Sequence, residues 1–245
     1  MELFWAAFLG LLQGLTEFLP VSSSGHLVLA QEFMSDFSQP GVLFDVVLHA
    51  GTLLAIIFYF RRTILKIKAR YLLLLGLATI PAALIGFFFN SAIEGFFKNI
   101  KLVGLALIFT ALLNFLTDRT KSRKKKTSYL EAFWIGIAQA LAIIPGISRS
   151  GATIFTGTTL GVEKKKAAEF SFLLSVPAVI GANLLQFFNY GTKGVDNPGF
   201  YFVGFLAAFF SGILAIDLVL KFLLAKRFRL FAFYCLILGL AILIF

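Results

Sequence analysis

Two polar segments interrupt the apolar chain, and they carry the side chains best suited to chemistry. The first spans residues 13–26 and contains a carboxylate, three consecutive serines and a histidine. Gln13 and Glu17 are four residues apart, so they share one face of a helix. Pro20 cannot continue that helix, and the serines after it are good N-caps for the next one. Glu17 beside hydroxyls and His26 indicates general acid–base or nucleophilic chemistry.

The second polar segment spans residues 145–153 and contains one arginine between two serines. Arg149 keeps its charge, so at membrane depth it needs an anion, either Glu17 from the first segment or a phosphate. Both segments also begin a helix with serine and glycine, whose free amides attract anions. We therefore expect a diphosphate-sized site that includes Ser22, Ser24, Gly25, Ser148, Ser150, Gly151 and Thr153.

The composition places these segments in a membrane protein. The 245 residues are 59% hydrophobic and 14% charged, with 31 phenylalanines, and the mean hydropathy is +0.92. A soluble domain has roughly 25% charged residues, so soluble, disordered, collagen-like, coiled-coil and disulfide-rich classes are excluded. The net charge of +10 comes from residues between apolar runs. No basic face suited to nucleic acid exists, so membrane lipids and no nucleic acid are the expected partners.

Six apolar stretches are long enough to cross a bilayer as helices. They are Leu43–Phe60, Tyr71–Phe89, Leu102–Thr117, Ala167–Phe188, Phe200–Leu220 and Phe228–Phe245. The two polar segments instead follow apolar runs, at 3–19 and 129–144, and precede arms too short to span. Polar backbone at membrane depth is tolerated only inside protein or along a wet cavity. The sequence thus predicts an all-α polytopic membrane protein with six transmembrane helices and two re-entrant helix–loop–helix hairpins.

The basic residues predict how the chain is oriented. Eighteen of the 22 lysines and arginines lie in four places, and residues 1–60 contain none. These places are Arg61–Arg70, Arg119–Lys126, Lys164–Lys166 and Lys221–Arg229. Basic loops stay cytoplasmic, which leaves 34–42, 90–101 and 189–199 outside. The first hairpin then enters from outside and the second from the cytoplasm.

An internal repeat supports this inverted arrangement. With a shift of 126 residues and no gap, six residues of the first hairpin match the second, and Phe44 matches Phe170. The six are Gly10, Gln13, Leu15, Ser22, Ser24 and Gly25. Each half contains one hairpin and three spans, so the halves are inserted upside down, and their broken helices converge near the midplane. We expect a single membrane domain over 1–245, built of repeat 1 (about 1–120) and repeat 2 (about 127–245).

At these two hairpins the chain resembles the undecaprenyl pyrophosphate phosphatases, also called the bacitracin-resistance family. The resemblance rests on residues 13–26 and 145–153, with further similar segments at 44–52 and 169–177. It implies hydrolysis of a polyprenyl diphosphate carrier to its monophosphate, which recycles the carrier for peptidoglycan and cell-wall synthesis and gives bacitracin resistance. It also implies a multi-pass protein of the bacterial inner membrane whose site opens to the periplasmic side. A homodimer is left open.

The resemblance also implies roles for particular residues. Glu17, Ser23, His26 and Arg149 match the family's catalytic positions, and a divalent cation such as Mg²⁺ or Ca²⁺ would be held by Gln13 and Glu17. The family often has Glu where Gln13 stands, which removes one anionic ligand here. The attacking group remains open among His26, Ser23 and water.

Two other functions are weighed against this hypothesis, and Asp45 and His49 are given a purely structural role. A lipid-phosphate transporter or flippase uses the same inverted scaffold, but it has no evident use for Glu17 beside His26. Another membrane phosphatase type needs a second histidine after its Ser-Arg element, whereas the only other histidine, His49, precedes Arg149. Asp45 and His49 are four residues apart near the outer end of a span, and we expect an ordinary helix-end pair there.

Overall fold

Apolar runs bounded by basic, proline-containing or polar segments fold as helices. The computed structural model describes residues 2–33, 42–121, 126–190 and 198–244, and every element over these ranges is helical. The elements are α1 (Glu2–Phe18), α2 (Ser23–Phe33), α3 (Val42–Tyr59), α4 (Arg61–Ile64), α5 (Ala69–Phe88), α6 (Asn90–Phe97), α7 (Ile100–Thr117), α8 (Tyr129–Leu141), α9 (Arg149–Thr159), α10 (Lys164–Tyr190), α11 (Pro198–Leu224) and α12 (Arg229–Ile244).

The chain is a helical membrane protein. Four helices of the described ranges are long and apolar enough to span a bilayer, namely α5, α7, α10 over 164–184, and α11. Two further helices, α3 and α12, are apolar over shorter segments, Leu43–Tyr59 and Arg229–Ile244. These six helices coincide with the six predicted apolar stretches.

A short helix lies in one of the predicted outer segments. Within residues 90–101, α6 follows α5 directly, and Phe89, with φ −119°, separates the two helices. Three predicted features lie wholly or partly outside the described residues. They are most of the outer segments 34–42 and 189–199, Lys193, and half of the basic run 119–126.

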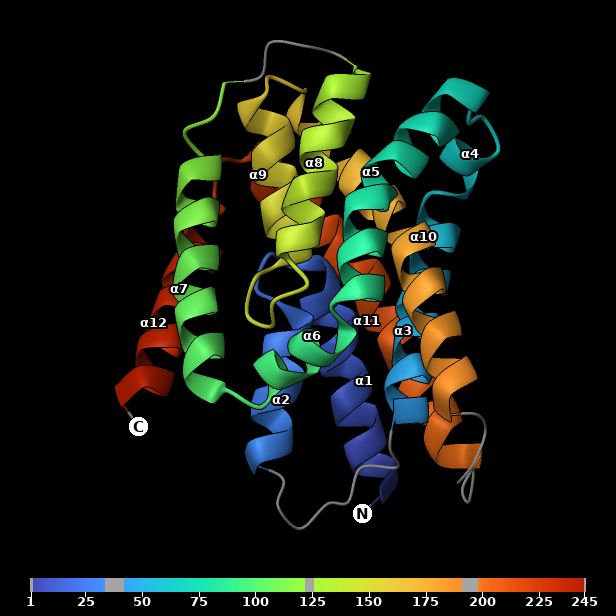
Figure 1. The fold of residues 1–245 in the computed structure, drawn as a ribbon, viewed down its shortest axis with the longest axis vertical. Helices are drawn as coiled ribbons and strands as arrows, with labels where there is room; N and C mark the ends of the chain where they lie inside the picture. The colour runs from blue at the N-terminus through green and yellow to red at the C-terminus, as the bar shows by residue number, and fades with distance from the viewer. Residues whose placement is uncertain (1, 34–41, 122–125, 191–197, 245) are drawn as a thin grey trace.

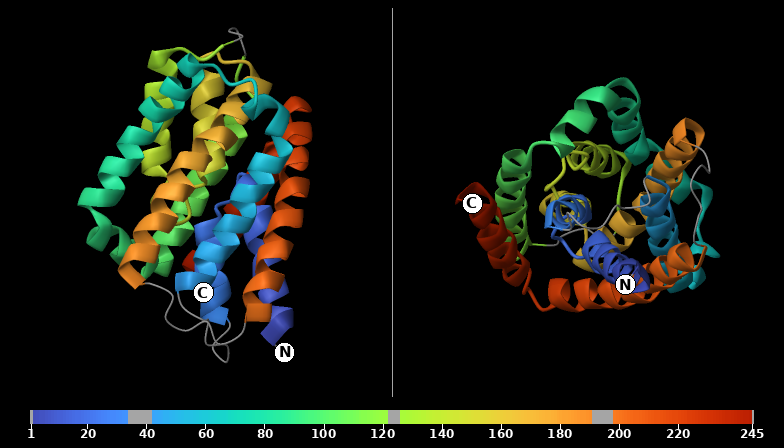
Figure 2. Two further views of the ribbon diagram at one scale, coloured as in Figure 1. Left: turned by 90° about the vertical axis from the view of Figure 1, so that its right-hand side faces the viewer. Right: turned by 90° about the horizontal axis from the view of Figure 1, so that it is seen from below.

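The two hairpins enter the molecule from opposite ends. In Figure 1, α1 and α2 run from the lower end to the middle and back, whereas α8 and α9 do the same from the upper end. The ends of α3, α7 and α11 and the start of α10, beside which the described basic residues cluster, lie toward the upper end (Figure 1). Seen end-on, the hairpins lie within a ring of the other helices (Figure 2).

Small residues allow the hairpins to pack closely against the ring. A Cβ on Gly10 of α1 would lie 2.4 Å from the carbonyl oxygen of Gly204 in α11. A Cβ on Gly136 of α8 would lie 2.5 Å from the carbonyl oxygen of Ala78 in α5. Since lipid tails are as apolar as leucine, close backbone packing of this kind is a main source of stability between helices in a bilayer.

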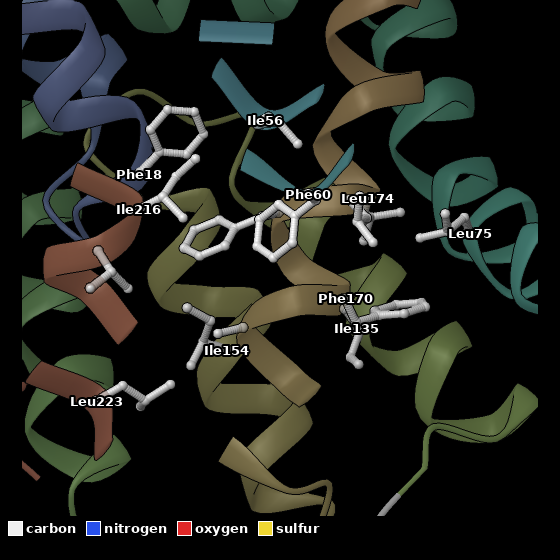
Figure 3. Close-up of a cluster of buried hydrophobic side chains, with 14 of the residues drawn as sticks. Phe18, Ile56, Phe60, Leu75, Ile135, Ile154, Phe170, Leu174, Ile216 and Leu223 are labelled. Carbon is white, nitrogen blue, oxygen red and sulfur yellow. The ribbon is translucent and has the colours of Figure 1, made fainter. Parts of the chain in front are cut away.

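Aromatic and aliphatic side chains fill the space between hairpins and ring on the basic side of the polar loops. Phe18 at the end of α1 meets Phe172 of α10 edge to face, with ring centroids 5.7 Å apart. Figure 3 shows this cluster, in which side chains from α1, α3, α5, α8, α9, α10 and α11 meet. The cluster fixes the end of α1, and therefore the loop that follows it.

Candidate functional site

The tips of the two hairpins meet, as the inverted arrangement predicts. The first tip is the loop 19–22 between α1 and α2, and the second is the loop 142–148 between α8 and α9. The Gly146 amide donates to Ser22 Oγ at 3.1 Å, and Ser150 Oγ donates to the Leu19 carbonyl at 3.2 Å. Gly146 has φ +98°, and a Cβ there would lie 2.5 Å from the Val103 carbonyl oxygen, so the turn requires glycine.

Glu17 gathers three partners at this meeting point. Its Oε1 forms an ion pair with Arg149 Nη2 from the other hairpin. Its Oε2 accepts from Ser23 Oγ at 2.6 Å and from Gln13 Nε2 at 3.1 Å. Glu17 is only 7% exposed, and a buried carboxylate needs such partners to stay ionised. The expectation that Glu17 supplies the anion for Arg149 is confirmed.

The other serines of both tips cap helices. Ser148 Oγ accepts from the Gly151 amide at 3.1 Å, and Ser22 Oγ accepts from the Gly25 amide at 3.3 Å. The hydroxyls of Ser22 and Ser24 are bonded to each other at 3.3 Å, and those of Ser148 and Ser150 at 3.2 Å. These four hydroxyls therefore organise the tips, whereas Ser23 points its hydroxyl at Glu17.

Thr153 lies one turn beyond Arg149 in α9 and turns away from the ion pair. Its Oγ1 donates to the Arg149 carbonyl at 2.7 Å and is bonded to Ser171 Oγ at 2.6 Å. Thr153 therefore links the first turn of α9 to α10.

His26 has both ring nitrogens engaged. Nδ1 lies 2.7 Å from the Ser22 carbonyl oxygen and Nε2 lies 2.7 Å from Tyr234 Oη. Because a carbonyl only accepts, Nδ1 carries the proton, and Nε2 of the neutral ring accepts from the tyrosine. The two rings are also stacked, with centroids 5.6 Å apart. No sequence signal pointed to Tyr234, which comes from α12, 208 residues away.

A cavity of about 530 Å³ opens beside the ion pair. Its polar part is formed by Glu17, Ser22, Ser23, Ser24, Ser148 and Arg149. Its apolar part comes mainly from α5, α6 and α10, through residues such as Ala82, Phe87, Ile93, Phe97, Ala178 and Ala182. His26, Gly25, Ser150, Gly151 and Thr153 are not among the residues that line it. A polar end beside a long apolar region suits an amphiphile with an anionic head.

Comparison with known proteins shows the family to which the chain belongs. A profile of the family described as Bacitracin resistance protein BacA matches residues 6–241. The chain belongs to the BacA family. A relative from Syntrophotalea carbinolica, named Undecaprenyl-diphosphatase, is 43% identical over 98% of this chain and 97% of its own. Proteins of the same name from Christiangramia forsetii and Carboxydothermus hydrogenoformans are 41% and 42% identical over 100% of this chain and 98% and 97% of theirs.

His49 and Gln139 are among the polar side chains of this BacA-family cavity that sequence reasoning did not assign to the site. His49 of α3, expected as half of a helix-end pair, lines the cavity, and its Nδ1 donates to the Asp45 carbonyl at 2.8 Å. Gln139 of α8 also lines it. The shift of 126 residues, which pairs Gln139 with Gln13, was the available signal for the glutamine.

The residues present fit the divalent cation that the resemblance to BacA proteins implies, provided that a ligand shares it. Gln13 Oε1 is buried, has no hydrogen-bond partner and belongs to the side chain that touches Glu17. Among the described residues no three His, Cys, Asp or Glu side chains gather as a complete site. Mg²⁺ is commonly held by one or two carboxylates together with substrate phosphates. Gln13 and Glu17 suit that kind of site.

Proposed function

We propose that this BacA-family chain hydrolyses undecaprenyl diphosphate to undecaprenyl phosphate and inorganic phosphate. The observation that carries the proposal is the contact of Ser23 and Arg149 with one carboxylate, Glu17, at the polar end of a largely apolar cavity. Whole-length relatives named Undecaprenyl-diphosphatase support it. A hydroxyl, a base and a guanidinium beside apolar space are what a lipid diphosphate requires.

Binding uses the charge of Arg149. Its planar fork suits two oxygens of the terminal phosphoryl group, and the incoming anion takes over part of the role that Glu17 plays in the free protein. The seryl caps hold both hairpin tips still, so the arginine is presented in one geometry. Positioning and charge neutralisation of this kind dominate phosphoryl transfer.

Ser23 is the proposed nucleophile, because its hydroxyl already donates to Glu17 at 2.6 Å. The proton passes to Glu17 Oε2 as Ser23 Oγ bonds to the terminal phosphorus, and the bond from that phosphorus to the bridging oxygen breaks. The lipid monophosphate leaves. Glu17 then gives its proton to solvent and accepts another from the water that attacks the phosphoserine. The bond from phosphorus to Ser23 Oγ breaks, Glu17 returns that proton to Ser23 Oγ, and inorganic phosphate leaves.

His26 has a positioning role in this scheme, because both of its ring nitrogens are engaged. It holds the Ser22 carbonyl at the end of the loop, directly before Ser23, the first residue of α2. A divalent cation such as Mg²⁺ or Ca²⁺, held by Gln13 and Glu17, would supply neutralisation of charge on the phosphate oxygens when bound.

The proposed topology is six transmembrane helices and two re-entrant hairpins in a bacterial inner membrane. The hairpins reach only the middle of the molecule, and the basic segments share one end (Figure 1), which supports a cytoplasmic assignment for that end. The cavity is lined by Phe87 of α5 and by Ile93 and Phe97 of α6, toward the other end. The site therefore opens to the outer, periplasmic side.

The proposed division into inverted repeats, about 1–120 and 127–245, draws support from packing. Gly10 meets Gly204 and Gly136 meets Ala78, and the shift of 126 residues converts the first pair into the second with the roles of the halves exchanged. Each hairpin thus packs on the last-but-one long helix of the opposite half, which ties the two halves into one domain.

Phosphate release from undecaprenyl diphosphate by the detergent-purified protein tests the proposal. We expect cation-dependent release, loss of about 10³-fold or more in Ser23→Ala, and a phosphoserine trapped at acid quench in the wild type. Ser175→Ala is the matched control, since it removes a buried hydroxyl that donates to the Phe172 carbonyl and does not line the cavity. A folded wild type without release would refute the phosphatase, and release without a phosphoserine would refute the nucleophile and favour water. The transporter alternative is not favoured, because transport does not require a serine hydroxyl hydrogen-bonded to Glu17.

A further inference from the structure

Gln139 is the most conspicuous buried polar group that the proposed mechanism leaves without a task. It lies in the last turn of α8, is 3% exposed and lines the cavity. Neither its Oε1 nor its Nε2 has a hydrogen-bond partner within the protein. Buried side-chain amides are nearly always hydrogen-bonded, since an unpaired one loses its bonds to water without replacement.

The related glutamine explains why Gln139 has no partner. Gln13 donates to Glu17, the residue four positions later on the same helix face. The residue four positions after Gln139 is Ile143, which also lines the cavity and offers no polar atom. The partner of Gln139 therefore has to come from the cavity itself.

The position of Gln139 indicates which part of a lipid diphosphate it meets. The polar end of the cavity is formed by Glu17, Ser23 and Arg149, where the terminal phosphoryl group reacts. Ala82 and Ala83 of α5, the helix on which α8 packs at Gly136, line the apolar part. Gln139 lines the same cavity from the last turn of α8. Once Ser23 and Arg149 engage the terminal phosphoryl group, the lipid-proximal phosphoryl group is the anion that remains for its amide.

We propose that Gln139 donates Nε2–H to the phosphoryl group that stays on the lipid. The inference rests on the proposed function and extends it by dividing the head group between two contacts. Arg149 binds the terminal phosphoryl group, and Gln139 binds the lipid-proximal one. The amide then contacts substrate and product alike, so it contributes to affinity rather than to the chemical step.

Steady-state kinetics of Gln139→Met distinguish this role from a structural one. We expect KM for undecaprenyl diphosphate and Ki for undecaprenyl phosphate to rise together by about tenfold, the effect of one hydrogen bond to a charged group. We expect kcat and inhibition by inorganic phosphate to change little. The unliganded variant should melt at the same temperature as wild type or higher, because an unpaired amide has been removed.

Thr79→Val is the matched control, because Thr79 lines the same cavity but its hydroxyl already donates to the Leu75 carbonyl at 2.8 Å. It should leave both constants near their wild-type values. Unchanged KM and Ki in Gln139→Met, or a fall in both kcat and melting temperature, would overturn the inference while leaving the phosphatase intact. If the wild type releases no phosphate, the proposed function fails. Thermal stabilisation by undecaprenyl phosphate then tests the Gln139 contact separately. If the ligand stabilises the wild type but not Gln139→Met, the contact is supported. If it stabilises both equally, the contact is refuted.

Discussion

The two hairpins share one framework and differ in the residues that could react. In both tips a serine caps the second helix by accepting from a glycine amide three residues later, at 3.3 Å for Ser22 and 3.1 Å for Ser148. In both, that serine is bonded to the serine two positions on, Ser24 or Ser150. The residues that match between the halves therefore build the turn.

In the proposed function, the residues that do not match carry the chemistry. With the shift of 126 residues, Glu17 stands opposite Ile143, and Ser23 stands opposite Arg149. One hairpin thus supplies the acid and the hydroxyl, and the other supplies the cation, so the ion pair forms only between halves. The proposed reacting groups therefore lie at positions where the two hairpins differ. The following tests address that view.

The largest effect is expected from exchanging the divergent residues for their counterparts. Glu17→Ile and Arg149→Ser should each lower phosphate release by at least about 10³-fold. Each should also destabilise the protein by about 3–5 kcal/mol, because the partner charge is left buried alone. The double variant should regain most of the stability, since it leaves no unpaired charge, but no activity.

A double-mutant cycle of thermal unfolding in detergent, with phosphate release measured on the same samples, checks this outcome. If activity returned together with stability in the double variant, the ion pair would be a structural device and the reacting groups would lie elsewhere.

Much of the hairpin chemistry was readable from the sequence, because polar residues at membrane depth are expensive and therefore conspicuous. The pairing of Glu17 with Arg149, the meeting of the tips and the six apolar helices were all predicted. The serine caps follow from residue type at helix starts, although the same serines were also predicted as substrate ligands, a role that stays a prediction.

What the sequence could not provide came from residues far apart along the chain. Tyr234 bonds to His26 across 208 residues, and nothing in the local pattern of α12 marks it. His49 looked like an ordinary helix-end residue because its Nδ1 partner, the Asp45 carbonyl, is local. Its place on the cavity depends on how α3 packs beside the hairpins. The sequence placed residues 90–101 outside the membrane but did not predict that they contain the short helix α6.

A smaller effect, equal in the two halves, is expected at the packing glycines. Gly10→Ala and Gly136→Ala each push a Cβ to within 2.5 Å of a carbonyl oxygen on the opposite half, so each should cost about 1–3 kcal/mol of stability. Gly76→Ala is the control, because a Cβ there meets nothing within 4 Å, and it should be neutral or slightly stabilising. If thermal unfolding showed a loss of stability in only one of these two alanine variants, the two halves would not pack equivalently.

The smallest effect is expected where the first hairpin has His26 and the second has Ala152. Tyr234→Phe leaves the buried Nε2 of His26 without its donor, which should cost about 1 kcal/mol of stability. Tyr129→Phe, on an exposed tyrosine, should change stability by less than about 0.5 kcal/mol. If His26 positions the Ser22 loop, Tyr234→Phe should lower kcat a few-fold while KM is kept. If His26 instead attacks phosphorus through Nε2, removing the phenol frees the nucleophile, and kcat should hold or rise. The sign of the change in kcat therefore decides whether this divergent residue reacts or supports the one that does.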